Sequence, residues 1–136
     1  MKVIVDTSVW SLALRRKKKQ ARNEIRILES LINGQNVCML GPIRQEILSG
    51  IKDDQQFEKL RDYLSAFDDF TISIRDYEKA AEFYNSCRAK GIQGSNTDFL
   101  ICAVSVNNRY PIFSSDKDFV RFSRYLPIVL MKEFLH

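Results

Sequence analysis

Short apolar runs of strand length alternate with longer segments of helical periodicity along most of this 136-residue chain. Runs that are apolar without alternation are typical of strands buried on both faces of a parallel sheet. Strands are expected at residues 2–6, 36–40, 70–74, 111–114 and 127–130. Helices are expected from Thr7 or Ser8 onward, at residues 25–32, from Gly41 onward, and at residues 54–67, 77–87 and 97–108.

The helix at residues 97–108 depends on its flanks, because residues 99–106 are nearly all apolar or small. Periodicity alone does not separate a buried strand from a buried helix in such a run. Asn96 and Thr97 are suitable N-caps, and the charge of Asp98 suits a first helical turn. We therefore predict a buried helix.

This alternation predicts an α/β fold, a three-layer α/β/α sandwich with a mainly parallel central sheet. A chain of this length is expected to form one domain, residues 1–136. In such folds ligands bind outside the carboxyl ends of the strands. Asp6 and Asp116 each follow a predicted strand, so both are expected at that edge of the sheet.

Four acidic residues stand at boundaries of apolar segments and are the candidate catalytic and metal-binding groups: Asp6, Glu46, Asp98 and Asp116. Carboxylates held close together raise one another's pKa unless a cation neutralises them. Oxygen ligands without histidine or cysteine favour hard ions, so the expected cofactor is Mg²⁺, with Mn²⁺ as a substitute. Such ions suit phosphodiester hydrolysis, because they activate water and neutralise phosphate.

Other polar residues near these acids are weaker candidates. Ser8, Ser114 and Ser115 can orient water or phosphate, although each also suits a helix cap or a turn. Asp118 is either a fifth metal-binding acid or an exposed helix cap. The only histidine is His136, the last residue, which argues against histidine-based acid–base catalysis.

Composition narrows the class of protein further. An apolar fraction of 45% and a charged fraction of 28% are those of a folded globular protein. The three cysteines lack metal-binding spacing and are expected to be buried thiols in a reducing compartment. No run has membrane-spanning length, and the first residues do not form a signal peptide, so we expect a cytoplasmic protein without membrane contact.

The net charge of +4 is unevenly distributed along the chain. Seven cations crowd into a dozen positions: Arg15, Arg16, Lys17, Lys18, Lys19, Arg22 and Arg26. This stretch is either a solvated helix end and loop or a contact for a polyanion such as RNA.

Several motifs together resemble a known family. Residues 3–8 read VIVDTS, residues 97–101 read TDFLI and residues 114–119 read SSDKDF, while Glu46 lies in a helix begun by Pro42. In this order and spacing they resemble PIN-domain ribonucleases, specifically VapC-type toxins of type II toxin–antitoxin systems. The resemblance covers essentially the whole chain.

The resemblance implies a PIN-like fold and a Mg²⁺- or Mn²⁺-dependent endoribonuclease whose acidic quartet is the four candidate acids. Asp6 and Asp98 would be the most direct metal ligands. Glu46 would bind metal or position the attacking water, and Asp116 would complete the site with support from Asp118. The family also implies an RNA substrate, often transfer RNA, a cognate antitoxin that covers the site, and a homodimer.

Two other functions fit the same residues. One is a PIN-like nuclease in RNA processing or at DNA ends, because metal-bound acids do not distinguish ribose from deoxyribose. The other is a non-catalytic nucleic-acid-binding module whose acids hold a structural ion. A partner surface is a further hypothesis: the aromatic residues Trp10, Phe119, Phe122 and Tyr125 either form an exposed apolar patch or pack in the core.

Overall fold

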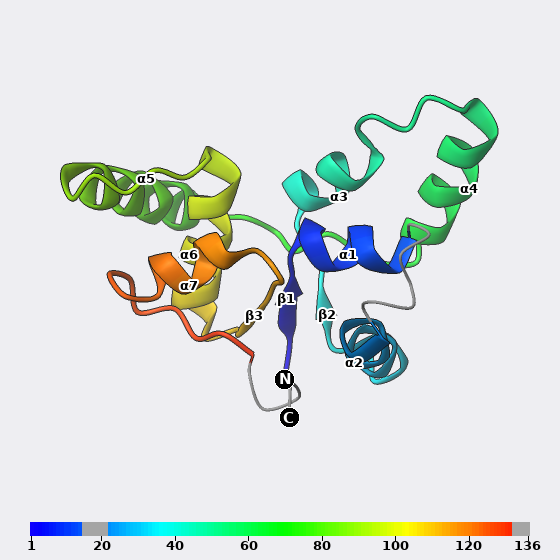
Figure 1. Ribbon diagram of the computed structural model, residues 1–136, viewed down its shortest axis with the longest axis horizontal. Helices are drawn as coiled ribbons and strands as arrows, with labels where there is room; N and C mark the ends of the chain where they lie inside the picture. Colours follow the sequence, from blue (N-terminus) through cyan, green and yellow to red (C-terminus); the bar gives the residue numbers. More distant parts are fainter. Residues whose placement is uncertain (15–21, 132–136) are drawn as a thin grey trace.

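The computed structural model describes residues 1–14 and 22–131. Residues 15–19 of the basic stretch and the terminal His136 lie outside the described residues, so the hypotheses on them stay predictions. Figure 1 shows a small central sheet with helices on two sides. None of the helices in the described ranges is both long enough and apolar enough to cross a membrane.

The sheet consists of three parallel strands in the order β2-β1-β3. Their bounds are Val3–Val5 for β1, Val37–Cys38 for β2 and Ile112–Phe113 for β3. Ile4 of the central strand pairs with Cys38 on one side and with Ile112 on the other. All of β1 is buried, as expected for a strand covered on both faces.

Seven helices surround this sheet in the described ranges. Their bounds are Thr7–Leu14 (α1), Arg22–Asn33 (α2), Gly41–Leu48 (α3), Asp54–Leu64 (α4), Ile74–Ala89 (α5), Asn96–Asn108 (α6) and Lys117–Phe122 (α7). In Figure 1, α5, α6 and α7 lie on one side of the strands and α1 to α4 on the other. The predicted α/β fold with a parallel sheet is therefore confirmed.

The predicted strand at residues 70–74 is wrong. In its place a single bridge joins Met39 to Asp69, and α5 already begins at Ile74. The cause is a capping box in which the Ser73 hydroxyl accepts from the Asp76 N–H and the Asp76 carboxylate accepts from the Ser73 N–H. Two satisfied backbone donors favour a helix start over continued pairing.

The predicted strand at residues 127–130 is also wrong. Only Leu130 forms a bridge, to Ile112, and hydrogen bonds from the Ile112 and Met131 N–H groups flank it. Pro127 has no N–H to donate to a ladder, which limits pairing at the start of this segment.

Of the two alternatives for the four aromatic residues, an exposed patch or packing in the core, the core holds for three of them. Trp10, Phe119 and Phe122 are at most 1% exposed and belong to the core, whereas Tyr125 is 44% exposed. Phe119 and Phe122 lie on α7, a helix that the sequence pattern does not reveal because it spans only six residues. Three of the four aromatic residues are thus packing residues.

Helix α6 runs through the middle of the core. Phe99 at its start is fully buried, and its ring lies 5.6 Å from the Tyr84 ring of α5 and 5.0 Å from the Phe122 ring of α7. Cys102 one turn later is also fully buried, and burial raises the pKa of its thiol. All three cysteines are buried free thiols, as predicted.

Gly94 is required where the α5–α6 loop crosses this aromatic cluster. A Cβ at Gly94 would lie 2.7 Å from the Phe122 ring and 2.9 Å from the Phe99 ring. Both rings are packed and unable to yield cheaply, so we expect Gly94→Ala to lower the free energy of unfolding by about 1–3 kcal/mol. Urea denaturation measures this loss of stability. Gly50→Ala is the comparison variant: Gly50 has a left-handed φ of +86°, but no atom lies within 4 Å of a Cβ there, so this variant has backbone strain without a clash. An unchanged midpoint for Gly94→Ala would contradict the close approach.

Asp76 connects α5 to α6 by a hydrogen bond, and its carboxyl makes the free energy of unfolding depend on pH. The carboxyl is 3% exposed, and Asn107 donates to it at 2.9 Å. Burial by itself would raise its pKa, but hydrogen bonds from Ser73 and Asn107 and the charge of Arg75 outweigh burial, so the pKa lies below its usual range.

A lowered folded-state pKa stabilises the protein above the unfolded-state pKa, about 3.9, and this contribution is lost as the pH falls through the folded-state value. We expect Asp76→Asn to cost about 1–2 kcal/mol at pH 7, because the charged acceptor is lost. The difference from the unmodified protein should shrink in urea titrations from pH 5 to pH 3. A difference that stays constant over this range would contradict the role of the charge.

Candidate functional site

Asp6 lies at the carboxyl end of β1 and is held by three donors. Its Oδ2 accepts from the Ser8 hydroxyl at 2.8 Å, from the Ser114 hydroxyl at 2.9 Å and, more weakly, from the Ser8 N–H at 3.4 Å. The backbone explains this position, because the Asp6 N–H donates to Phe113 of β3 and places Asp6 beside the segment that carries Ser114. Asp6 is 6% exposed, and the hydrogen bonds that its carboxylate accepts from the described residues all go to Oδ2, none to Oδ1.

Ser8 and Ser114 therefore orient a carboxylate. Their hydroxyl oxygens lie 3.2 Å apart, and the Ser8 oxygen also accepts from the Ser115 N–H at 3.0 Å. Ser115 contributes its backbone to this network, while its side chain is exposed and forms no hydrogen bond within the described ranges. The water-positioning role predicted for these serines stays a prediction.

Glu46 reaches the same region from α3. Its Oε1 accepts from the Thr7 hydroxyl at 2.7 Å, and Thr7 is the residue next to Asp6. Pro42 stands in the first turn of α3, where its missing N–H costs nothing, so the helix begins early enough to include Glu46. Glu46 is exposed, which leaves its second oxygen accessible to water.

Asp98 is positioned by the capping box of α6. The Ser95 hydroxyl accepts from the Asp98 N–H at 3.0 Å, and the Ser95 N–H donates to the Asp98 carboxylate at 3.1 Å. Burial raises the pKa of the Asp98 carboxyl, and the negative charges of Asp6 and Asp116 raise it further against the hydrogen bonds from Ser95. The three carboxyls thus lie within electrostatic reach of one another.

Asp116 is the N-cap of α7, and its Oδ1 accepts from the Asp118 N–H at 2.9 Å. It follows Ser114 by two residues, and its own N–H donates to the Ser114 hydroxyl at 3.0 Å. Asp118 pairs with Arg121 at 3.2 Å, so its carboxylate already has a cationic partner.

The structure therefore gathers Asp6, Asp98 and Asp116 at one edge of the sheet, with Glu46 joined to them through Thr7. No three histidine, cysteine, aspartate or glutamate side chains of the described ranges converge closely enough to form a ready-made metal cage. The donors are nonetheless all hard oxygens, the kind that Mg²⁺ and Mn²⁺ prefer. The repulsion at Asp98 is of the kind that a bound cation relieves.

Two residues of this arrangement are missing from the sequence-based candidates. Thr7 orients Glu46, and Ser95 caps α6 together with Asp98. Ser95 had a readable signal, the Ser-x-x-Asp spacing of a capping box. Thr7 had none, because its contact with Glu46 spans 39 positions of the chain.

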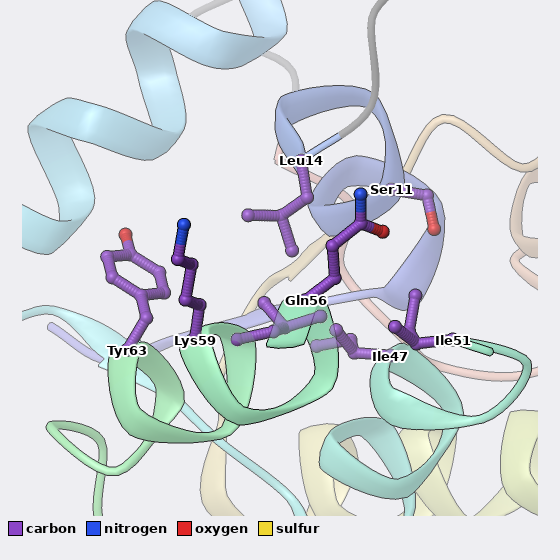
Figure 2. Close-up of a pocket in the computed structure, with 8 residues that line it drawn as sticks. Ser11, Leu14, Ile47, Ile51, Gln56, Lys59 and Tyr63 are labelled. Atoms are coloured by element: carbon purple, nitrogen blue, oxygen red, sulfur yellow. The ribbon is translucent and has the colours of Figure 1, made fainter. Parts of the chain in front are cut away.

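Two cavities are lined in part by α3. One, of about 380 Å³, is mostly apolar and lies between α1, α3 and α4. Figure 2 shows Leu14, Ile47 and Ile51 around it, with Lys59 and Tyr63 at its rim. The other, of about 500 Å³, lies between α3, α5 and α6 and has a more polar lining.

The sequence matches the family model of the PIN domain over residues 3–125. No curated protein matches the sequence significantly.

Solved structures with the same fold include three with sequence identities of 16% to 20%. A chain in the structure of VapBC2 from Rickettsia felis bound to a DNA fragment from their promoter is 19% identical, with TM-score 0.71 and coverage of 96% of this chain and 98% of that one. A chain of FitAcB from Neisseria gonorrhoeae is 16% identical, with TM-score 0.75 and coverage of 98% and 99%. A chain of a toxin–antitoxin complex from Klebsiella pneumoniae is 20% identical, with TM-score 0.63 and coverage of 87% and 90%.

Proposed function

This chain belongs to the PIN domain family, and from that membership we propose that it is a Mg²⁺- or Mn²⁺-dependent endoribonuclease, the toxin of a type II toxin–antitoxin pair. The proposal rests above all on the position of Asp6, Asp98 and Asp116 at one edge of the sheet, where burial and the charges of Asp6 and Asp116 raise the pKa of the Asp98 carboxyl. A site that concentrates negative charge in this way needs a cation to bind a phosphodiester. The toxin–antitoxin structures with the same fold support the assignment to such a pair.

Asp6 and Asp98 are the proposed direct metal ligands, with Glu46 and Asp116 completing the site. Mg²⁺ does not need a three-carboxylate cage, because it usually keeps several waters and is bound by one or two carboxylates together with substrate phosphate. When bound, the ion activates water and stabilises charge on the phosphate oxygens. Asp118 is a weaker candidate ligand, because its carboxylate pairs with Arg121.

The protein's own side chains orient the proposed metal ligands, and one of them is the proposed proton acceptor. Ser8 and Ser114 bind one oxygen of Asp6 and leave the other free for a ligand. Thr7 holds one oxygen of Glu46, and the exposed second oxygen is the proposed acceptor for a proton of the attacking water. Because these donors come from α1 and from the end of β3, the sheet itself positions the site.

The proposed inhibitory partner is an antitoxin segment that occupies the apolar cavity of Figure 2. Leu14 is 40% exposed and Tyr63 is 47% exposed beside this cavity, so apolar surface is available for a partner helix. We expect Ile51→Lys to retain nuclease activity and to escape inhibition by the proposed antitoxin. Full inhibition of Ile51→Lys would place the partner elsewhere.

The homodimer stays a proposal, to be measured by light scattering.

The experiment that tests the enzyme is incubation of total cellular RNA with the purified chain and Mg²⁺ or Mn²⁺. EDTA and Asp98→Asn are the controls, the variant with its fold verified by circular dichroism. Discrete products that require metal and disappear in the variant would support a selective endoribonuclease. Equal cleavage of single-stranded DNA would favour a nuclease of processing or DNA ends, and intact RNA after long incubation would favour a non-catalytic binding module.

A further inference from the structure

The cavity between α3, α5 and α6 lies directly beside the acidic cluster. Gln45, which lines it, precedes Glu46 on α3, and Thr97, which also lines it, precedes Asp98 on α6. Its volume of about 500 Å³ is within the range of small-ligand sites. Whatever occupies this cavity is therefore next to the groups proposed to cleave the phosphodiester.

Two tyrosines supply flat surfaces in this cavity. Tyr84 is half-buried and is fixed by an edge-to-face contact with Phe99, with ring centroids 5.6 Å apart. Tyr77 lies on the same face of α5, about two turns before Tyr84, and is 55% exposed. Aromatic side chains of this kind are the usual stacking partners of unpaired RNA bases.

Three amides supply hydrogen-bonding groups. Gln45, Asn85 and Asn96 line the cavity, and none of their side chains forms a hydrogen bond within the described ranges. Amides present a donor and an acceptor together, which matches the edge of a nucleobase. Among the residues that the structure describes, no charged side chain lines the cavity, and its lining suits a neutral ring better than a phosphate.

We infer that this cavity receives one nucleobase of the RNA strand next to the cleaved phosphate and reads its edge through the three amides. The inference rests on the proposed function, because it names how the same site selects its substrate. It predicts that cleavage depends on the identity of one base at a fixed distance from the cut.

The test compares cleavage of an RNA pool with randomised positions, read by sequencing the cut ends. The unmodified protein should prefer one base at a fixed offset by roughly tenfold or more, the discrimination of a bidentate amide contact. Gln45→Ala and Asn85→Ala should flatten this preference at that offset while cleavage still requires metal. Both positions are exposed and helical, so alanine is expected to preserve the fold. Gln55→Ala, an exposed amide deletion on α4, is the matched control and should keep the preference.

Two results would overturn the base-reading cavity and leave the nuclease intact: cleavage without base preference at any offset, or an unchanged preference in both variants. A third would replace it with a protein interface. If Tyr77→Ala converts a dimer to a monomer in light scattering, and base preference is unchanged, a second copy of the chain covers the cavity.

A binding experiment separates failure of the inference from failure of the proposed function. Fluorescent single-stranded tetranucleotides of each base are titrated with the protein in Mg²⁺ and followed by anisotropy. One outcome is that no RNA is cleaved, while one base binds roughly tenfold more tightly and Asn85→Ala removes this preference. That outcome would support base binding in the cavity and contradict the proposed nuclease activity. Equal binding of all four, unaffected by Asn85→Ala, overturns the cavity.

Discussion

Asp6→Asn is expected to reduce RNA cleavage by at least about 100-fold with the fold intact. Loss of a group that merely orients a metal ligand typically costs about 10- to 100-fold, so loss of a proposed ligand should cost no less than the upper end. Asparagine has the shape of aspartate and keeps one acceptor oxygen for Ser8 and Ser114. It removes the negative charge, and the attraction for a cation falls with it.

Single-turnover cleavage rates at several Mg²⁺ concentrations measure this effect. Asp62→Asn on α4 is the matched control, because Asp62 is well exposed and its ion pair with Arg61 is long, at 3.6 Å. Thermal unfolding of both variants verifies the fold. Cleavage by Asp6→Asn at the unmodified rate, with the same metal requirement, would remove Asp6 from the catalytic site.

Phe99→Ala is expected to lower the free energy of unfolding by about 3–5 kcal/mol, the cost of deleting a buried aromatic side chain and leaving a cavity. Phe99 is fully buried and contacts helices before and after α6, through Tyr84 and Phe122. It is also the neighbour of Asp98, so the loss loosens the helix start that positions this carboxylate. A domain of this size has only about 5–15 kcal/mol of stability to lose.

Urea denaturation measures the loss, with Val106→Ala as the control. Val106 lies on the same helix but is only partly buried, so its truncation should cost less than Phe99→Ala. Phe99→Leu should recover part of the stability, because it fills part of the cavity. A loss below about 1 kcal/mol for Phe99→Ala would show that the aromatic cluster repacks around the gap.

Local patterns predicted much of the site because they act over a few residues. The flanks of the apolar run at residues 99–106 identified a helix, and α6 does span Asn96–Asn108. Its N-cap is Ser95, one residue before the predicted caps. A negative charge in the first turn of a helix is favoured by the helix dipole, and Asp98 occupies that position in α6. There its carboxylate takes part in a capping box with Ser95.

The same local reasoning failed where a cap and a strand pattern compete. Residues 70–74 have strand-like composition, but the reciprocal hydrogen bonds of Ser73 and Asp76 start α5 at Ile74. Ser73 and Asp76 have the Ser-x-x-Asp spacing of a capping box, the same local signal as Ser95 and Asp98, and this signal outweighs the strand-like composition before it. The buried position of Phe119 and Phe122 likewise depends on α7 packing against Phe99, a contact between distant segments.

The sequence alone determined the α/β class, the parallel sheet and the four candidate acids, because hydrophobic periodicity and strand ends are local properties. Only the tertiary structure decided where those acids lie in space and which side chains donate hydrogen bonds to them. It joined Asp6 to Ser114 across 108 positions and Glu46 to Thr7 across 39, and it placed three amide-bearing helices around one cavity. These contacts depend on how parallel strands and their helices pack in three dimensions, and no spacing along a single chain specifies such packing.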